Sequence, residues 1–156
     1  MSQPNKPHKQ ELARQVQRRP STLLDHDAVV EAYKRNGLGV AVGAFFSRAG
    51  GRPCVCPFGA ILVDQRAVDE LGNNLRGREL EEYENFVDIA ADLLDVSSDD
   101  VAELIAGFDG ESMRGQPSAI FTEGRTLYGV LERYARTANV PVWRKAPVGK
   151  PGQRRR

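Results

Sequence analysis

Arg52-Pro-Cys-Val-Cys-Pro-Phe-Gly-Ala-Ile-Leu-Val63 is the stretch around which the chain is organised. It holds both cysteines of the chain, at positions 54 and 56, and Pro57 then opens an apolar run. Proline suits the first turn of a helix, where a backbone N–H would have no partner. The apolar residues that follow recur at helical spacing: Phe58, Ile61, Leu62, Val68 and Leu71. We therefore expect a helix that begins at Pro57 and ends at Gly72.

The segment before this stretch predicts one well-defined helix, over about residues 25–36. Apolar side chains recur there at helical spacing: Ala28, Val29, Ala32 and Tyr33. Asp25 is a suitable N-cap for this helix, and Gly37 is a suitable C-terminal stop.

Residues 38–46 are apolar on both faces, so their periodicity leaves a buried strand and a short buried helix equally open. Residues 47–51 have the composition of a turn, and residues 52–55 then return beside the first segment. We favour a short hairpin of these two segments. Pro53 would confine the second strand to an edge or a bulge, because proline donates no ladder hydrogen bond.

A long amphipathic helix is expected over about residues 78–94, after a loop at residues 73–77. Its inward face is apolar: Leu80, Tyr83, Phe86, Val87, Ala90, Leu93 and Leu94. A short helix over about residues 98–107 follows, because Ser97 can cap the N–H of Asp100.

Gly107-Phe-Asp-Gly110 is expected to break that short helix. The last helix is expected over about residues 123–138, and Asn139 ends it. Its face is apolar: Leu127, Val130, Leu131 and Tyr134. Trp143 should fold back onto the body, because a large aromatic side chain is costly to expose. The pattern as a whole predicts a mainly helical α+β fold, with four to five helices around a small β-hairpin.

Charge is distributed unevenly along the chain. The formal net charge is +1, but residues 1–20 carry five basic residues against one acidic residue, and residues 144–156 carry six basic residues and no acidic one. Residues 21–143 therefore carry a net charge of −9. We predict a disordered basic arm over 1–20, a single globular domain over 21–143 and a disordered basic tail over 144–156.

Length and composition are those of an ordinary soluble globular protein. A chain of 156 residues suits one domain, which can bury a core without help from metals or disulfides. It contains no run of about 18 apolar residues, so we expect no membrane span and no membrane partner. The N-terminal residues lack the apolar core of a secretory signal. We expect a cytoplasmic protein whose cysteines are reduced.

Cys56 immediately precedes the expected helix, whose dipole favours a thiolate and offers a physical route to a reactive thiol. A nucleophilic cysteine also needs a base, which is normally a histidine. Of the two histidines, His8 lies in the basic arm, and nothing in the sequence brings His26 to Cys56. We therefore favour a buried structural cysteine over a reactive one.

The sequence predicts no catalytic residue, no metal site and no cofactor. Two cysteines spaced C-x-C and one histidine in a helix supply fewer than the four ligands of a structural zinc site, although a second subunit or a carboxylate would complete the set. Asp109 and Glu111 lack the spacing of oxygen ligands in an EF-hand. The chain also lacks a glycine loop of the phosphate-binding type.

The basic ends are a separate source of function. Lysine and arginine clusters bind polyanions with release of counterions, without reading a base sequence. The candidate partner-binding residues are Lys6, Lys9, Arg14, Arg18, Arg19, Arg144, Lys145, Lys150, Arg154, Arg155 and Arg156. These ends contain no aromatic residue on which a base could stack, which argues against specific recognition of single strands.

Three motifs carry a resemblance: Cys56-Pro-Phe-Gly-Ala60, the helix start Val96-Ser-Ser-Asp-Asp-Val101 and the turn at Gly107–Gly110. Their arrangement resembles small uncharacterised bacterial and phage proteins, in which a strand-like segment and a glycine turn lead into a C-x-x-G-A helix. The resemblance covers about residues 28–136 and implies an architecture but no activity. It also implies that residues 59 and 60 are small so that the helix can approach the hairpin closely.

For function, we expect a non-enzymatic macromolecule-binding or adaptor protein with a protein partner. The first alternative is a nucleic-acid-associated protein that binds through its basic ends. The second alternative is a thiol-dependent enzyme or redox sensor at Cys56.

Overall fold

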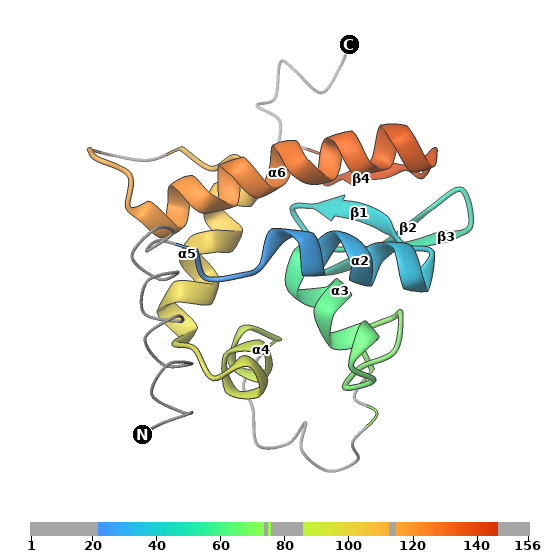
Figure 1. Cartoon of the computed structure of the whole chain (residues 1–156), viewed down its shortest axis with the longest axis horizontal. Helices are drawn as coiled ribbons and strands as arrows, with labels where there is room; N and C mark the ends of the chain where they lie inside the picture. The colour runs from blue at the N-terminus through green and yellow to red at the C-terminus, as the bar shows by residue number, and fades with distance from the viewer. Residues whose placement is uncertain (1–21, 74, 76–85, 113–114, 147–156) are drawn as a thin grey trace, which may run out of the picture.

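The computed structural model describes residues 22–73, 75, 86–112 and 115–146. Over these ranges the chain forms a mixed α+β fold, as expected, with five helices and four strands (Figure 1). The helices are α2 (His26–Asn36), α3 (Pro57–Asp64), α4 (Phe86–Leu94), α5 (Ser98–Phe108) and α6 (Ala119–Ala138). The strands are β1 (Gly39–Val42), β2 (Phe46–Ala49), β3 (Arg52–Val55) and β4 (Val142–Arg144). None of these helices is both long and apolar enough to cross a bilayer.

The sheet is larger than the predicted hairpin. Its four strands lie in the order β2-β3-β1-β4. Residues 47–49, which were expected in a turn, belong to β2, and β2 pairs with β3 as the antiparallel hairpin. The first apolar run instead forms β1, which pairs in parallel with both β3 and β4. The predicted hairpin is therefore wrong in its first strand, because a parallel pair joins segments with no short turn between them.

Pro53 lies in an inner strand of the sheet, although an edge strand or a bulge was expected. On one side it lies opposite Arg48 of β2. On the other side, pairing with β1 begins only at Cys54, which lies opposite Gly39. Proline is tolerated at this position because β1 does not extend alongside it, so its missing N–H leaves no β1 carbonyl without a donor.

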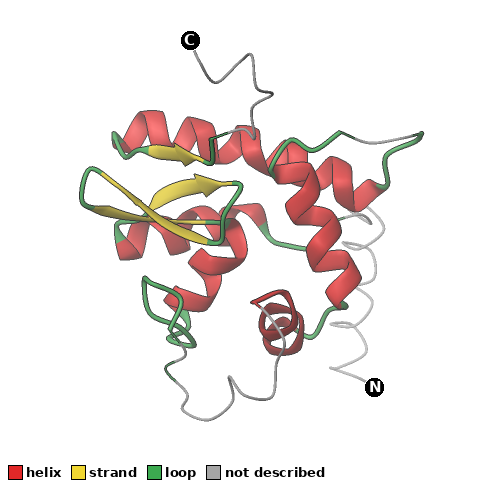
Figure 2. Cartoon of the chain, turned by 180° about the vertical axis from the view of Figure 1, so that it is seen from behind, coloured by secondary structure: helices red, strands yellow, loops and turns green. Residues whose placement is uncertain are grey.

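The first helix matches its prediction. The Asp25 carboxylate accepts the backbone N–H of Asp27 and Ala28, and Gly37 ends α2 with a left-handed φ of 63°. α2 lies in front of the sheet in Figure 1 and behind it in Figure 2. The hydroxyl of Tyr33 ties the helix to the sheet, because it donates to the carbonyl of Val55 at 2.6 Å.

α3 is shorter than predicted, since it ends at Asp64. Arg66 follows with a left-handed φ of 62°. Leu71, which was expected on the inner face, is 58% exposed, so that expectation is wrong. The small residue at position 59 has the expected purpose, because a Cβ on Gly59 would lie 3.1 Å from the Cβ of Val55 in β3.

The predicted long helix before Ser97 is seen in part, as α4. Leu80 and Tyr83 lie outside the described residues. Ala90 is fully buried, as expected, while Phe86 and Val87 pack at the border of the core.

α5 and α6 cross with their main chains in contact. α5 continues one residue past its predicted end, to Phe108, and ends within the Gly107–Gly110 motif as expected, with Asp109 as its C-cap. A Cβ on Gly107 would overlap the carbonyl oxygen of Phe121 in α6, and a Cβ on Gly124 would overlap that of Leu104 in α5. α6 also begins four residues before its predicted start, because Ser118 caps it.

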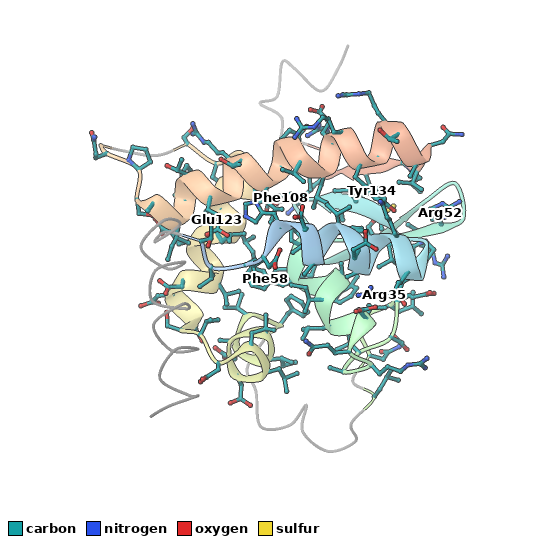
Figure 3. The ribbon with its side chains drawn as sticks, viewed as in Figure 1. Arg35, Arg52, Phe58, Phe108, Glu123 and Tyr134 are labelled. Atoms are coloured by element: carbon teal, nitrogen blue, oxygen red, sulfur yellow. The ribbon has the colours of Figure 1, made fainter. Side chains whose placement is uncertain are left out.

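The core lies between the sheet and the helices that cover it. Large buried side chains fill it: Tyr33, Phe58, Phe108, Phe121, Leu104, Leu127 and Leu131. Figure 3 labels Phe58 and Phe108 inside this layer, and Tyr134 beneath α6. The Tyr134 hydroxyl donates to the carbonyl of Leu38 at 2.9 Å and ties α6 to the start of β1.

The folded domain extends past its predicted boundary at residue 143. Trp143 is half-buried and lies opposite Ala41, so it folds back as expected. Arg144, which was expected in a disordered tail, is the last residue of β4 and lies opposite Val42. The N–H of Lys145 then donates to the carbonyl of Val42 at 3.0 Å. Two of the predicted tail residues are therefore held by the sheet.

Candidate functional site

A hollow of about 380 Å³ lies where the carboxyl ends of β1 and β4 meet the end of α5 and the middle of α6. Its lining includes Val42, Phe108, Asp109, Arg125, Tyr128 and Arg144. Figure 3 labels Phe108 beneath α6. The hollow thus combines an apolar base with two guanidinium groups, a phenol and a carboxylate.

A hydrogen bond from a backbone N–H to a side-chain carboxylate joins two parts of the rim of this hollow. Gly43 follows β1 with a φ of 89°, and its N–H donates to Oδ1 of Asp109 at 2.9 Å. A Cβ on Gly43 would lie 2.8 Å from the Cβ of Lys145, so a larger residue would push β4 away. The turn after β1 is therefore clamped between α5 and the end of β4.

Each arginine of the hollow rests on an aromatic ring. The guanidinium of Arg125 lies 5.0 Å from the ring centroid of Phe121, and that of Arg144 lies 5.1 Å from the centroid of Tyr128. Arg144 also donates a hydrogen bond to the Tyr128 hydroxyl. Cation–π contact holds a guanidinium in place without neutralising its charge.

Neither guanidinium is within ion-pair distance of a carboxylate of the described chain. Arg35, by contrast, forms a two-point contact with Asp64, with its Nη2 2.8 Å from Oδ2. Arg125 and Arg144 therefore present two positive charges to the same hollow, which suits an anionic ligand.

Asp109 gives the hollow a third charged group. Burial raises the pKa of this carboxyl, while the hydrogen bond from Gly43 opposes the rise and the nearby Glu111 adds to it. Asp109 and Glu111 were weighed as calcium ligands from the sequence, but the described residues contain no group of three acidic, histidine or cysteine side chains that could hold a metal. Asp109 instead connects α5 to the turn after β1.

A second hollow, of about 330 Å³, surrounds Glu123 and His26 at the start of α6. Glu123 is 5% exposed, and among the described residues it is the one charged side chain that is buried. Its carboxylate accepts the N–H of Leu23 at 2.5 Å and the N–H of Leu24 at 3.0 Å. Nε2 of His26 lies 2.9 Å from Oε2, and it must be the donor to an ionised carboxylate. Figure 3 shows Glu123 beside the start of α2.

Glu123 is thus the partner that fixes His26. Burial alone would raise the pKa of the Glu123 carboxyl, but the hydrogen bonds from His26, Leu24 and Leu23 outweigh it and hold the pKa below its ordinary value. The group is committed to three donors that attach the segment before α2 to α6. This arrangement stabilises the fold and leaves the carboxylate little freedom for acid–base chemistry.

The cysteines are buried side chains of the core, as favoured from the sequence. Cys56 is 1% exposed and Cys54 is fully buried. Cys56 is the N-cap of α3, and its Sγ accepts the N–H of Gly59 at 3.3 Å. Burial raises the pKa of the Cys56 thiol to about 12, which outweighs the hydrogen bond from Gly59. Burial therefore opposes the stabilisation that the helix dipole would give to a thiolate at this position.

Most residues of the predicted binding ends lie outside the described ranges: Lys6, Lys9, Arg14, Arg18, Arg19, Lys150, Arg154, Arg155 and Arg156. The structure places the remaining two, Arg144 and Lys145, at the end of β4. It brings Arg144 to the hollow.

Sequence reasoning missed Arg125 and Tyr128 as site residues. Both lie in the predicted last helix, at positions that resemble any solvated or half-buried helix face. One signal was available: Arg125 and Tyr128 are three residues apart and so share a face of the helix. That they meet Arg144 depends on the pairing of β1 with β4, which no local pattern reveals.

Comparison with known proteins adds no assignment: no protein-family model, no curated protein and no solved structure matches this chain. The resemblance to small bacterial and phage proteins with a C-x-x-G-A helix stays a prediction.

Proposed function

We propose that this protein is a non-enzymatic macromolecule-binding protein and that its partner is a nucleic acid, which it contacts at the hollow between β4 and α6. The observation that carries the proposal is the pair of guanidinium groups, Arg125 and Arg144, that face this hollow without a carboxylate partner in the described chain. Arginine is well suited to phosphate oxygens because its planar fork donates two parallel hydrogen bonds.

The position of Arg144 supports the proposal. It stands at the root of the basic sequence 144–156, where six residues are lysine or arginine and none is acidic. Residues 21–143 carry a net charge of −9 and repel a polyanion elsewhere on the surface. The hollow and the two basic ends are then the parts of the chain that attract phosphate.

The buried titratable groups support a binding role over an enzymatic one. Cys56 caps α3, Glu123 holds the segment before α2, and Asp109 holds the turn after β1. Each of these groups has a structural partner that accounts for its position. A thiol-dependent reaction is disfavoured further by the burial of Cys56.

A protein partner is the second candidate. It is favoured by two large apolar side chains on the surface, Leu71 at 58% and Leu75 at 53% exposure. Scattered exposed leucines are normal on a folded protein, so this observation is weaker than two guanidinium groups that have no carboxylate partner among the described residues.

The experiment that tests the proposal is fluorescence anisotropy of the full chain with single-stranded oligonucleotides of about 16 nucleotides. We expect binding whose affinity falls steeply between about 50 mM and about 200 mM salt, because phosphate contacts release counterions. Arg144→Gln should weaken binding and reduce the slope of log affinity against log salt by about 1.

Arg133→Gln is the matched control. Like Arg144→Gln, it removes one positive charge, but Arg133 lies in α6 and lines a different surface hollow, beside Val30 and Lys34 of α2. Binding that is absent at about 50 mM salt, or equally weakened by both variants, would show that the proposed partner or the proposed surface is wrong.

A further inference from the structure

We infer that the hollow between β4 and α6 holds one nucleotide of a single strand, with its base stacked on the Arg144–Tyr128 pair and its phosphate between Arg144 and Arg125. This inference rests on the proposed function and deepens it, because it assigns a base contact as well as a phosphate contact. General attraction to a polyanion requires only the charges.

The stacking surface is the first reason. The basic ends of the sequence contain no aromatic residue, but the fold brings Tyr128 of α6 to Arg144 at the root of the C-terminal segment. The guanidinium lies over one face of the phenol ring, 5.1 Å from its centroid, and Arg144 is exposed to solvent. A base can therefore stack on the outer face of the guanidinium plane, as bases do on arginine and aromatic side chains.

The support behind this pair is the second reason. Phe108 is 2% exposed, and its ring meets that of Tyr128 edge to face, with centroids 5.7 Å apart. The Tyr128 hydroxyl also lies 3.4 Å from Oε2 of Glu132. Phe108 packs against the Tyr128 ring and Glu132 accepts a hydrogen bond from its hydroxyl, so the stacking surface is formed before a ligand arrives. A preformed surface lowers the entropy cost of binding.

Asp109 is the third reason, because it would distinguish among bases. Its Oδ1 accepts the N–H of Gly43, and the carboxylate lines the same hollow as the two arginines. A carboxylate in a site for a polyanion is unfavourable unless it accepts hydrogen bonds from the ligand. Cytosine offers an exocyclic amino group as a donor, whereas thymine offers a carbonyl at the same position. We therefore expect the site to prefer cytosine over thymine.

The volume fits a ligand of this kind. A hollow of about 380 Å³ is within the range of small-ligand sites, and it is open rather than enclosed, as a site on a continuous strand must be. It also lies at the carboxyl ends of two parallel strands, β1 and β4, which is where open parallel sheets commonly bind ligands.

The first test compares two oligonucleotides of equal charge with the full wild-type chain: oligo(dC) of about 16 nucleotides and an abasic strand of the same length. We expect oligo(dC) to bind about 5- to 150-fold more tightly, since stacking of one base is worth about 1–3 kcal/mol. Equal and salt-dependent binding of both strands would overturn the inference and leave the proposed function intact. Failure of both strands to bind would overturn the proposed function, and the inference with it.

The second test assigns the contact to these residues. Arg144→Gln should reduce the preference for oligo(dC) over the abasic strand, whereas Arg133→Gln on the α2 side of α6 should retain it. Asp109→Asn keeps an oxygen for Gly43 but weakens the acceptor in the hollow, so we expect it to lower the ratio of oligo(dC) to oligo(dT) affinity by about fivefold. An unchanged ratio would exclude Asp109 from base recognition. Loss of the preference in Arg133→Gln would place the base elsewhere.

Discussion

Gly124 of α6 lies directly against the carbonyl oxygen of Leu104 in α5, so that the two helices touch main chain to main chain. Gly107 of α5 makes the reciprocal contact with the carbonyl of Phe121. This close crossing brings the end of α5, with Phe108 and Asp109, to the same place as Arg125 and Tyr128. The candidate site therefore depends on two residues that have no side chain.

We predict that Gly124→Ala destabilises the fold by about 2 kcal/mol or more, because a methyl group has no space between the two main chains. Urea unfolding at neutral pH measures the effect. Gly129→Ala is the control in the same helix, since a Cβ there would meet nothing within 4 Å. It should stabilise the fold by about 0.5–1 kcal/mol, through the better helix propensity of alanine. A neutral Gly124→Ala variant would contradict the close crossing.

Glu123 should make stability depend on pH. Its folded-state pKa lies below the ordinary value of about 4.3, so its contribution is complete above that pH and is lost as the pH falls through the folded-state pKa. We expect Glu123→Gln to cost about 2 kcal/mol at pH about 7, where the charged acceptor of three hydrogen bonds is lost. The difference between variant and wild type should shrink at pH about 3.

Glu31→Gln provides the comparison for that measurement. Glu31 is exposed and its carboxylate lies 3.6 Å from the ammonium of Lys34, so its removal should change the unfolding free energy by less than about 0.5 kcal/mol. A Glu123 variant that behaves like the Glu31 variant at both pH values would contradict the role assigned to Glu123.

Cys56 should resist alkylation in the folded protein. With a pKa of about 12, about one thiol in a thousand is ionised at pH 9, and the side chain is 1% exposed. Iodoacetamide labelling followed by mass spectrometry should find Cys56 unmodified at pH about 9, and modified once urea unfolds the chain. Rapid labelling of folded protein would revive the thiol enzyme or redox sensor as a function.

Ser97 should contribute to stability as a helix cap. Its hydroxyl accepts the N–H of Asp100 at 3.0 Å at the start of α5. We expect Ser97→Ala to cost about 1 kcal/mol in urea unfolding, because one N–H of the first turn loses its acceptor. Ser97→Asp keeps an acceptor and should remain close to wild type. Equal losses in both variants would show that capping is not the cause.

Local patterns in the sequence were sufficient to predict the elements that are determined by residues close together in the chain. The helix caps at Asp25 and Ser97 and the buried cysteine at position 56 were predicted correctly. The reason is physical: a cap is satisfied by donors two or three residues away, and helical spacing places apolar side chains on one face. The end of α3 was missed because Val68 continues the apolar pattern after the helix has stopped.

Tertiary structure alone decided the sheet and the site. The parallel pairing of β1 with β4 joins residues about a hundred positions apart, and the sequence carries no local turn signal for such a pair. That pairing makes Arg144 part of the fold and places it on Tyr128. The sequence by itself determined the basic composition of the C-terminal end. Only long-range packing decided which of its charges face a hollow, because the position of a charge depends on the backbone that holds it.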